Sequence, residues 1–433
     1  MSVFQFSIEK KISGALGRAG VLETPHGSIE TPAFVVVGTK ASVKSLSPEQ
    51  VKDLGAQVVL ANTYHLYVEP GDKTVSDAGG LHKFMNWNGP TMTDSGGFQA
   101  FSLGADFGKK GGKISKGDAK EPEIKHSSIL QNTRMFNDET EENGGSQEEP
   151  ALAKITEDGV AFKSYKDGSK HFFTPERSIE IQHNIGADMI FAFDECTSPH
   201  ASHDYQREAM ERTHRWASRS LAEHKRARRT TQNGRGMTQN GKQALFGIVQ
   251  GGRFEDLRKE SATVIGAMDF DGFGIGGSFD KEDMYTTVRW VNELLPEEKP
   301  RHLLGIGEPV DLFGGIENGC DLFDCVAPTR MARNGTLHTK NGRINIFNAP
   351  FRNDLGPIDE GCECYTCSPR QGGASYTRAY VAHLFRSKEM FAATLASIHN
   401  LYFIVNLVKN IRQSILDGRF AEFKQEFLAG YRK

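Results

Sequence analysis

A single pattern recurs along this chain and limits the folds that are open to it. A short apolar run rich in β-branched residues ends in a polar residue or a glycine, and a loop and a helix-like spacing follow. Alternating strands and helices predict parallel strands joined by helical crossovers. The runs end at Asn62, Asp94, Asp194, Gln250, Gly276 with Gly277, Gly305 with Gly307, and Asp324.

Two parallel architectures are compatible with this pattern, the doubly wound sheet and the (β/α)8 barrel. An open sheet collects its ligand at one switch point and uses only a few strands for it. Here about seven successive strands each carry a polar or glycyl residue at the carboxyl end, which is how barrel active sites are assembled. We therefore predict an α/β fold of the (β/α)8 TIM-barrel class.

Local signals support helices between these strands. Ser47, Pro48 and Gln50 match a capping box, and Thr174 followed by Pro175 marks a second helix start. Residues 280–296 and 308–319 have the spacing of amphipathic helices. Two polar, glycine-rich segments break the pattern, so we expect a flexible insertion over residues 105–150 and a smaller loop over residues 230–243.

Composition and charge exclude several classes of protein. We see no apolar run of the ~20 residues that a membrane span needs, and the N-terminus lacks a signal-peptide core. The formal charge is −3 and the pI about 6.5, so any RNA contact must come from a local patch. Six cysteines in 433 residues are too few for a disulfide scaffold. We expect a cytoplasmic enzyme without a membrane partner.

Three of the cysteines, Cys362, Cys364 and Cys367, lie in one polar, turn-rich segment. Thiolates at this spacing can share one ion, and they favour zinc over magnesium or calcium. A closed tetrahedron needs a fourth ligand, for which the downstream helical region offers His383 and His399. The alternative is three reduced cysteines packed in a core, for which this segment is poorly suited. We predict a structural site, because four protein ligands leave no position for water.

Three aspartates, Asp94, Asp194 and Asp324, each close a strand-like run and should point into one barrel mouth. Two carboxylates that face a glycosidic carbon can act as nucleophile and general acid/base. Each aspartate could instead cap the helix that follows it. Because three of them share one mouth, we favour an active site.

Glycines and arginines near the same mouth indicate what it binds. Glycines let backbone groups approach a planar ligand, and the chain has neither a complete GxGxxG nor a Walker motif. Phe98 could stack on a base or belong to the core. Arg330 and Arg333 follow Asp324 closely and could contact phosphates or base edges of RNA. The glycines are Gly96, Gly97, Gly251, Gly252, Gly276, Gly277, Gly305 and Gly307.

Together these motifs resemble those of the tRNA-guanine transglycosylases, the queuine and archaeosine tRNA-ribosyltransferases. The segments are TDSGGFQ, FDECT, FGIVQGG, GIGG, LLGIGEP, LFDCVAPTRMARNG, and CxCxxC followed by His-Asn. FDECT is similar to the bacterial type. The resemblance runs from about residue 10 to the C-terminus and implies a single domain over residues 1–433. The barrel would span about 10–350 and 375–433, with a small zinc subdomain over about 350–400.

The resemblance also implies roles for matching residues. Asp324 would be the nucleophile at ribose C1′ of guanosine 34, and Asp94 the general acid/base. Substrate-binding positions would be Asp94, Ser95, Gly96, Gly97, Phe98, Asp194, Gln250, Gly277 and Leu304. RNA-binding positions would be Gly305, Gly307, Asp311, Thr329, Arg330 and Arg333. One zinc ion would be held by Cys362, Cys364, Cys367 and His399.

The implied reaction exchanges guanine 34 of a tRNA anticodon for a free 7-deazaguanine base, through a covalent aspartyl-ribosyl intermediate, in queuosine biosynthesis. The sequence Asp-Glu-Cys at 194–196 favours 7-aminomethyl-7-deazaguanine, and queuine stays open because residues 278–281 depart from the usual family sequence beside the pocket. The partners would be tRNAs with GUN anticodons, for aspartate, asparagine, histidine and tyrosine. Family members usually pair as homodimers.

Two other interpretations compete with this one. A catalytically silent tRNA-binding subunit would have lost its acids, whereas Asp94 and Asp324 are both retained. A nucleoside or glycoside hydrolase could use the same two carboxylates. The arginine pair after Asp324 and the cysteine cluster favour the tRNA enzyme over a hydrolase.

Overall fold

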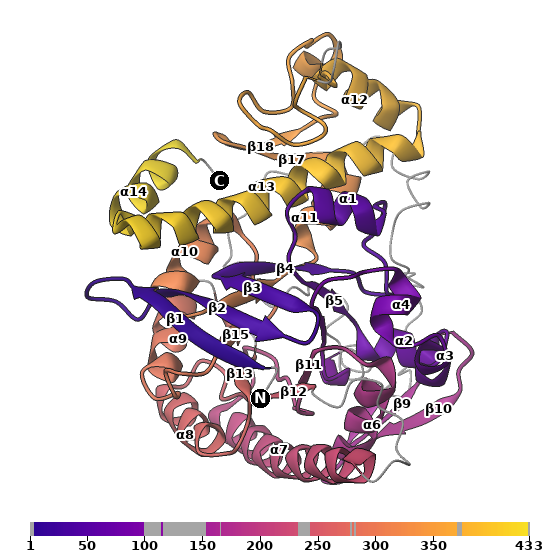
Figure 1. Ribbon diagram of the computed structural model, residues 1–433, viewed down its shortest axis with the longest axis vertical. Coiled ribbons are helices and arrows are strands. Elements are labelled where there is room, and N and C mark those ends of the chain that lie inside the picture. The colour runs from indigo at the N-terminus through magenta and orange to yellow at the C-terminus, as the bar shows by residue number, and fades with distance from the viewer. Residues whose placement is uncertain are drawn as a thin grey trace.

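The computed structural model describes residues 4–98, 114–115, 153–164, 166–232, 243–277, 279–280, 283–369 and 375–431. Eight parallel strands close into a barrel in the order β11-β12-β13-β15-β16-β4-β5-β6, which confirms the predicted (β/α)8 class (Figure 1). The strands are β4 (Ala33–Val37), β5 (Val59–Ala61), β6 (Thr91–Thr93), β11 (Met189–Phe191), β12 (Ala244–Val249), β13 (Gly272–Ile275), β15 (Arg301–Leu303) and β16 (Leu322–Asp324).

Helices connect the barrel strands and cover the outside of the barrel (Figure 1). Ser47 and Gln50 form the predicted capping box of α1, and Thr174 caps α6. The helix expected over 280–296 is shorter and spans Met284–Asn292. The helices are α1 (Pro48–Asp53), α2 (Thr63–Val68), α3 (Asp72–Asp77), α4 (Leu81–Met85), α6 (Pro175–Ile185), α7 (His203–Gln232), α8 (Glu255–Gly266), α9 (Met284–Asn292) and α10 (Pro309–Glu317).

Two three-stranded antiparallel sheets, the hairpin of β17 (Thr336–Thr339) and β18 (Gly342–Asn345) and one barrel strand were not among the predicted elements. The barrel strand is β4, although its sequence AFVVV is a β-branched run followed by Gly38. One sheet is formed by β1 (Gln5–Lys11), β2 (Arg18–Thr24) and β3 (Gly27–Thr31). The other is formed by β8 (Ala153–Ile155), β9 (Val160–Lys163) and β10 (Lys170–Phe173).

The N-terminal sheet closes the amino end of the barrel. Leu22 and Ile29 join the cluster of apolar residues that fills the barrel interior, and the ring of Phe4 meets that of Phe246 edge-on at 6.0 Å. Arg18 of β2 forms a fully buried ion pair with Asp321, whose carboxylate accepts from the guanidinium at 2.7 and 2.9 Å. Since Asp321 immediately precedes β16, this pair fixes the sheet to the base of the barrel wall.

Alternation along the strands decides what fills the barrel. Phe246 and Phe191 point inward, and each meets a glycine of β13: a Cβ on Gly272 would lie 2.6 Å from the ring of Phe246, and one on Gly274 would lie 2.9 Å from that of Phe191. Two large rings therefore fit only because the facing strand carries no side chain at these positions. The lower barrel is a packed apolar core, so ligands must bind at its carboxyl-end mouth.

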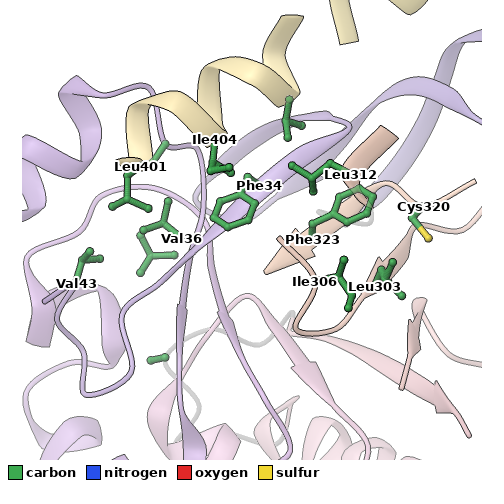
Figure 2. Packing of buried hydrophobic residues seen from close by; sticks show 14 of the residues in the cluster. Phe34, Val36, Val43, Leu303, Ile306, Leu312, Cys320, Phe323, Leu401 and Ile404 are labelled. Carbon is green, nitrogen blue, oxygen red and sulfur yellow. The ribbon is translucent and has the colours of Figure 1, made fainter. Parts of the chain in front are cut away.

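The long helix α13 (Met390–Asp417) packs on the outer face of the barrel. Figure 2 shows Leu401 and Ile404 of this helix next to Phe34 and Val36 of β4. Within the described residues, α13 alone is long and apolar enough to span a membrane, with a mean hydropathy of 1.5, but 72% of that stretch is buried in the fold. The expectation that no such stretch exists was wrong, because burial against the barrel demands the same composition.

The chain after β16 carries the remaining elements, which lie over one side of the barrel (Figure 1). They are α11 (Ala327–Arg333), β17 (Thr336–Thr339), β18 (Gly342–Asn345), the 3-10 helix η3 (Ala349–Arg352), α12 (Arg378–Arg386), α13 and α14 (Phe420–Gly430). The division into a barrel and a zinc subdomain stays a prediction. The insertion expected over 105–150 lies outside the described residues, apart from β7 (Ile114–Ser115), which pairs with β14 (Phe279–Asp280).

Candidate active site and metal centre

Asp94 stands at the carboxyl end of β6. Met92 belongs to the barrel interior, so Asp94 two residues later faces the mouth on the same side of the strand. Its Oδ1 accepts from the backbone N–H of Thr63 at 2.8 Å, and its Oδ2 accepts from the side-chain amide of Asn62. Asn62 also caps α2 by accepting from the N–H of His65 at 2.9 Å. The start of α2 therefore fixes the orientation of this carboxylate.

Asp324 is the last residue of β16, and its side chain is 16% exposed. Leu322 lies in the barrel interior, so Asp324 also faces the mouth. Its Oδ1 accepts two hydrogen bonds, from Nε2 of His302 at 2.8 Å and from the backbone N–H of Gly305 at 3.0 Å. The fold thus presents two carboxylates, from β6 and β16, at one end of the same barrel.

Asp194 forms a buried polar group with Ser95 and Gln250. Its Oδ1 accepts from the hydroxyl of Ser95 at 2.9 Å, and its Oδ2 accepts from the amide of Gln250 at 2.7 Å. The Oε1 atom of Gln250 is buried and has no hydrogen-bond partner among the described residues. A buried acceptor of this kind is costly unless a ligand donates to it, so the group is suited to bind N–H donors.

Glycines bring two turns close to this polar group. Gly277 has a φ of +95°, and a Cβ there would lie 2.6 Å from Arg258 and 3.0 Å from Oε1 of Gln250. Arg258, fully buried, donates to the carbonyl oxygens of Gly252 at 2.6 Å and of Gly276 at 2.8 Å. Burial lowers the pKa of Arg258 to about 9. This arginine ties the turns after β12 and β13 together behind the candidate pocket.

Sequence reasoning missed three residues at this mouth: Asn62 as a partner of Asp94, His302 and Arg258. His302 interrupts the apolar run HLLGIG at a position whose parity points it inward, and that signal could have identified it. Arg258 lies on α8, away from every strand end, and no local motif marks it. Phe98 and Leu304, predicted to sandwich a base, are both half-buried, and Leu304 packs against the barrel interior.

The predicted RNA-binding residues differ in how far they are exposed to solvent. Arg330 of α11 is exposed, whereas Arg333 and Thr329 are buried. Gly305 turns with a φ of +77° and donates to Asp324, as described above. A Cβ on Gly307 would lie 2.4 Å from that of Cys325.

Asp311 does not fit the predicted RNA contact. It is fully buried on α10, and its carboxylate accepts from the hydroxyl of Tyr285 at 3.2 Å. A buried carboxylate cannot reach RNA and would repel its phosphates. In the sequence, Asp311 closely follows the glycines of the motif GIGEP, which lie at the mouth. The first turn of α10 nevertheless directs its side chain into the protein.

Cys362, Cys364, Cys367 and His399 come together in a group that could hold a metal ion. The Nδ1 atom of His399 lies 3.7, 3.6 and 3.3 Å from the three sulfurs in that order. The nitrogen and sulfur ligands of a tetrahedral zinc ion would be about 3.5 Å apart, given Zn–S and Zn–N bonds of ~2.3 and ~2.0 Å. Nε2 of His399 donates to the carbonyl oxygen of His338 at 2.6 Å, which leaves Nδ1 as the ligand atom.

The thiols of this group cannot all ionise without a cation between them. Hydrogen bonds with the neighbouring thiols lower the pKa of Cys367 to about 4 and raise that of Cys364. None of the six cysteines forms a disulfide bond, in agreement with the expectation that the chain has no disulfide scaffold. Of the two histidines considered as a fourth ligand, His399 is the one that meets the thiols.

A second group, His26, His82 and Asp188, also has metal-ligating atoms close together. Nδ1 of His26 lies 2.6 Å from Asp188, which fits a hydrogen bond and is shorter than the ~3.4 Å between two ligands of one ion. Burial raises the pKa of Asp188, but hydrogen bonds from both histidines outweigh it and hold the pKa below its usual value. This group anchors the turn between β2 and β3 to the base of β11.

Fold and site together define an enzyme of the barrel class with carboxylates at the mouth and a cysteine–histidine group that could hold a metal ion. Comparison with known proteins specifies the family. The family model described as queuine tRNA-ribosyltransferase matches residues 13–137 and 120–433. The protein named queuine tRNA-ribosyltransferase of Thermoanaerobacter pseudethanolicus is 46% identical over 434 residues, which cover 100% of this chain and 98% of the relative.

Two further relatives carry the same name. That of Desulforamulus reducens is 44% identical over 427 residues, which cover 98% of each chain. That of Streptococcus gordonii is 42% identical over 433 residues, which cover 99% of this chain and 97% of the relative. The chain belongs to the queuine tRNA-ribosyltransferase family, as the motifs predicted.

Proposed function

We propose that this enzyme exchanges guanine 34 in the anticodon of a tRNA for a 7-deazaguanine base. The observation that carries the proposal is that two carboxylates, those of Asp94 and Asp324, lie at one barrel mouth. Each of them accepts hydrogen bonds from neighbouring groups that fix its orientation. Base exchange at a ribose without loss of the glycosidic configuration needs a nucleophile and an acid/base group. Family membership supports tRNA as the substrate.

The reaction follows two displacements. The nucleotide is flipped out of the anticodon loop into the mouth. Asp324 attacks C1′, the C1′–N9 bond breaks, and guanine leaves with a proton on N9 that Asp94 supplies. The incoming base then attacks C1′, gives its N9 proton to Asp94, and displaces the carboxylate of Asp324. The proton taken in the second step replaces the one lost in the first, so the enzyme returns to its starting state.

The polar group around Asp194 is the proposed binding site for the base. A guanine-like edge carries N–H donors, and both Asp194 and the unpartnered Oε1 of Gln250 are acceptors. The base would lie between Phe98 and Leu304. We propose 7-aminomethyl-7-deazaguanine as the incoming base, since the sequence Asp-Glu-Cys at 194–196 is similar to the bacterial type of the family.

Nucleoside analysis of unmodified tRNA tests the function and the base together. Incubation with 7-aminomethyl-7-deazaguanine should give a tRNA whose digest contains that nucleoside in place of guanosine 34, in tRNAs with GUN anticodons. A tRNA with another anticodon is the control. Queuine incorporation at a higher kcat/KM would overturn the choice of base. Release of guanine that leaves position 34 without any base would show a hydrolase instead.

Replacing each aspartate by asparagine separates the two catalytic roles. Asp324→Asn cannot form an ester, so it should give no denaturation-resistant enzyme–RNA adduct and lose base exchange by at least ~10³-fold. Asp94→Asn keeps the nucleophile, so a trace of adduct should form while turnover falls on the order of 10²–10⁴-fold. Denaturing gels without incoming base measure the adduct. An adduct in Asp324→Asn but never in Asp94→Asn would reverse the assignment.

We propose that the metal is one structural zinc ion. The support is three thiolates and one imidazole at tetrahedral separations, with no position for a water ligand. Neither catalytic aspartate is among the four ligands, so zinc would stabilise the C-terminal segment and take no part in the reaction.

Replacing Cys364 by serine should abolish zinc binding and weaken the C-terminal segment by several kcal/mol, because structural zinc contributes directly to folding free energy. Metal analysis by mass spectrometry and thermal unfolding measure the two effects. Cys320→Ser is the matched control, since Cys320 is equally buried but lies outside the cluster. Full zinc occupancy in Cys364→Ser would refute the assignment.

We further propose a homodimer, which forms in the cytoplasm where the tRNA is found. Aromatic side chains of Tyr365, Tyr376, Tyr380 and Phe391 form one group, with neighbouring ring centroids 5.7 to 6.1 Å apart. Three of them are 37 to 44% exposed, which is typical of interface surfaces. Sedimentation equilibrium should give twice the mass of the 47.8 kDa chain, and a concentration-independent monomer would contradict the dimer.

A further inference from the structure

His302 occupies an unusual position for an ionisable side chain. It lies inside the barrel on β15, paired in register with Gly274 of β13 and Leu322 of β16, and it is fully buried. The ring of Phe191 lies edge-on beside it at 5.6 Å. A buried polar ring in such a core is unfavourable unless it makes a hydrogen bond, and the bond it makes goes to Asp324.

The two ring nitrogens of His302 have different surroundings. Nε2 lies 2.8 Å from Oδ1 of Asp324, whereas Nδ1 is buried and has no hydrogen-bond partner among the described residues. A proton on Nδ1 would be buried without an acceptor. A proton therefore belongs on Nε2, where it can be donated to the carboxylate.

We infer that His302 is a positioning residue for the nucleophile, an inference that rests on the proposed role of Asp324. The Nε2–H of His302 and the N–H of Gly305 both donate to Oδ1. These two donors fix the plane of the carboxylate, and because both bond Oδ1, the two oxygens have different roles. Oδ1 holds the donors throughout, and Oδ2 forms the bond to C1′.

The donors have their largest effect in the second displacement. When the incoming N9 attacks C1′, the electron pair of the C1′–Oδ2 bond returns to the carboxylate, and the negative charge spreads onto Oδ1. Donors already aimed at Oδ1 stabilise this charge as it develops, without reorganisation. Loss of the His302 donor should therefore slow breakdown of the covalent adduct more than its formation.

Two variants of His302 test this inference. His302→Phe keeps a ring of similar size and removes the donor, whereas His302→Gln keeps an amide N–H near the position of Nε2. With 7-aminomethyl-7-deazaguanine and tRNA, His302→Phe should lose on the order of 10–100-fold in kcat with little change in KM for tRNA. A larger share of the enzyme should stand as adduct on denaturing gels during turnover. His302→Gln should recover most of the activity.

The outcomes separate this inference from the proposed function. If the wild-type enzyme forms no adduct, the proposed function fails. If it does and a folded His302→Phe turns over as fast as wild type, or if Phe and Gln lose activity equally in step with their thermal stability, His302 is not a positioning residue.

If the His302 variants fail to fold, a measurement that keeps His302 in place still tests the inference. Nitrogen-15 NMR of histidine-labelled protein should show one ring with Nε2 protonated and Nδ1 bare, whose Nε2 signal shifts in Asp324→Asn. A proton on Nδ1, or no shift in Asp324→Asn, would overturn the inference.

Discussion

Closure of eight parallel strands into one barrel is the constraint on which the site depends. Because side chains alternate along a strand, an inward residue in the core fixes which way the residue two positions later points. Met92 and Leu322 fill the core, and Asp94 and Asp324 therefore face the mouth. No loop needs to deliver either carboxylate, so their positions are as rigid as the barrel wall itself.

The three aspartates of the mouth are held in similar ways. Each accepts hydrogen bonds from groups whose own positions are fixed: Asp94 from the start of α2, Asp324 from β15 and the turn after it, and Asp194 from Ser95 and Gln250. A partly buried carboxylate without donors would be protonated or would move toward water. Hydrogen-bond donors at the strand ends therefore fix the orientation of these three carboxyl groups at the mouth.

The sequence was informative where chemistry is local, and uninformative where it depends on packing between distant segments. Strand-end aspartates, helix caps and the cysteine triplet follow from short-range rules, and the structure places them as expected. The position of Arg258 behind the candidate pocket could not be predicted, nor could the burial of Asp311. Both depend on how a helix is oriented against its neighbours. Cysteine spacing alone left His383 and His399 open, and the family resemblance indicated His399; the structure agrees, because α13 brings this histidine to the thiols.

The metal centre and the catalytic mouth are connected through one strand and one helix. His399 donates to the carbonyl of His338 on β17, and the neighbouring Asn400 accepts from the N–H of the same residue at 3.0 Å. The amide of Asn400 donates to the carbonyls of Pro328 and Thr336, at the two ends of the segment that carries Arg330. A metal at the cysteine cluster would therefore help to hold α11, which follows β16 in the chain and carries the exposed Arg330. Its physical role would be to order the segment that we propose to contact RNA, while the barrel positions the two proposed catalytic aspartates.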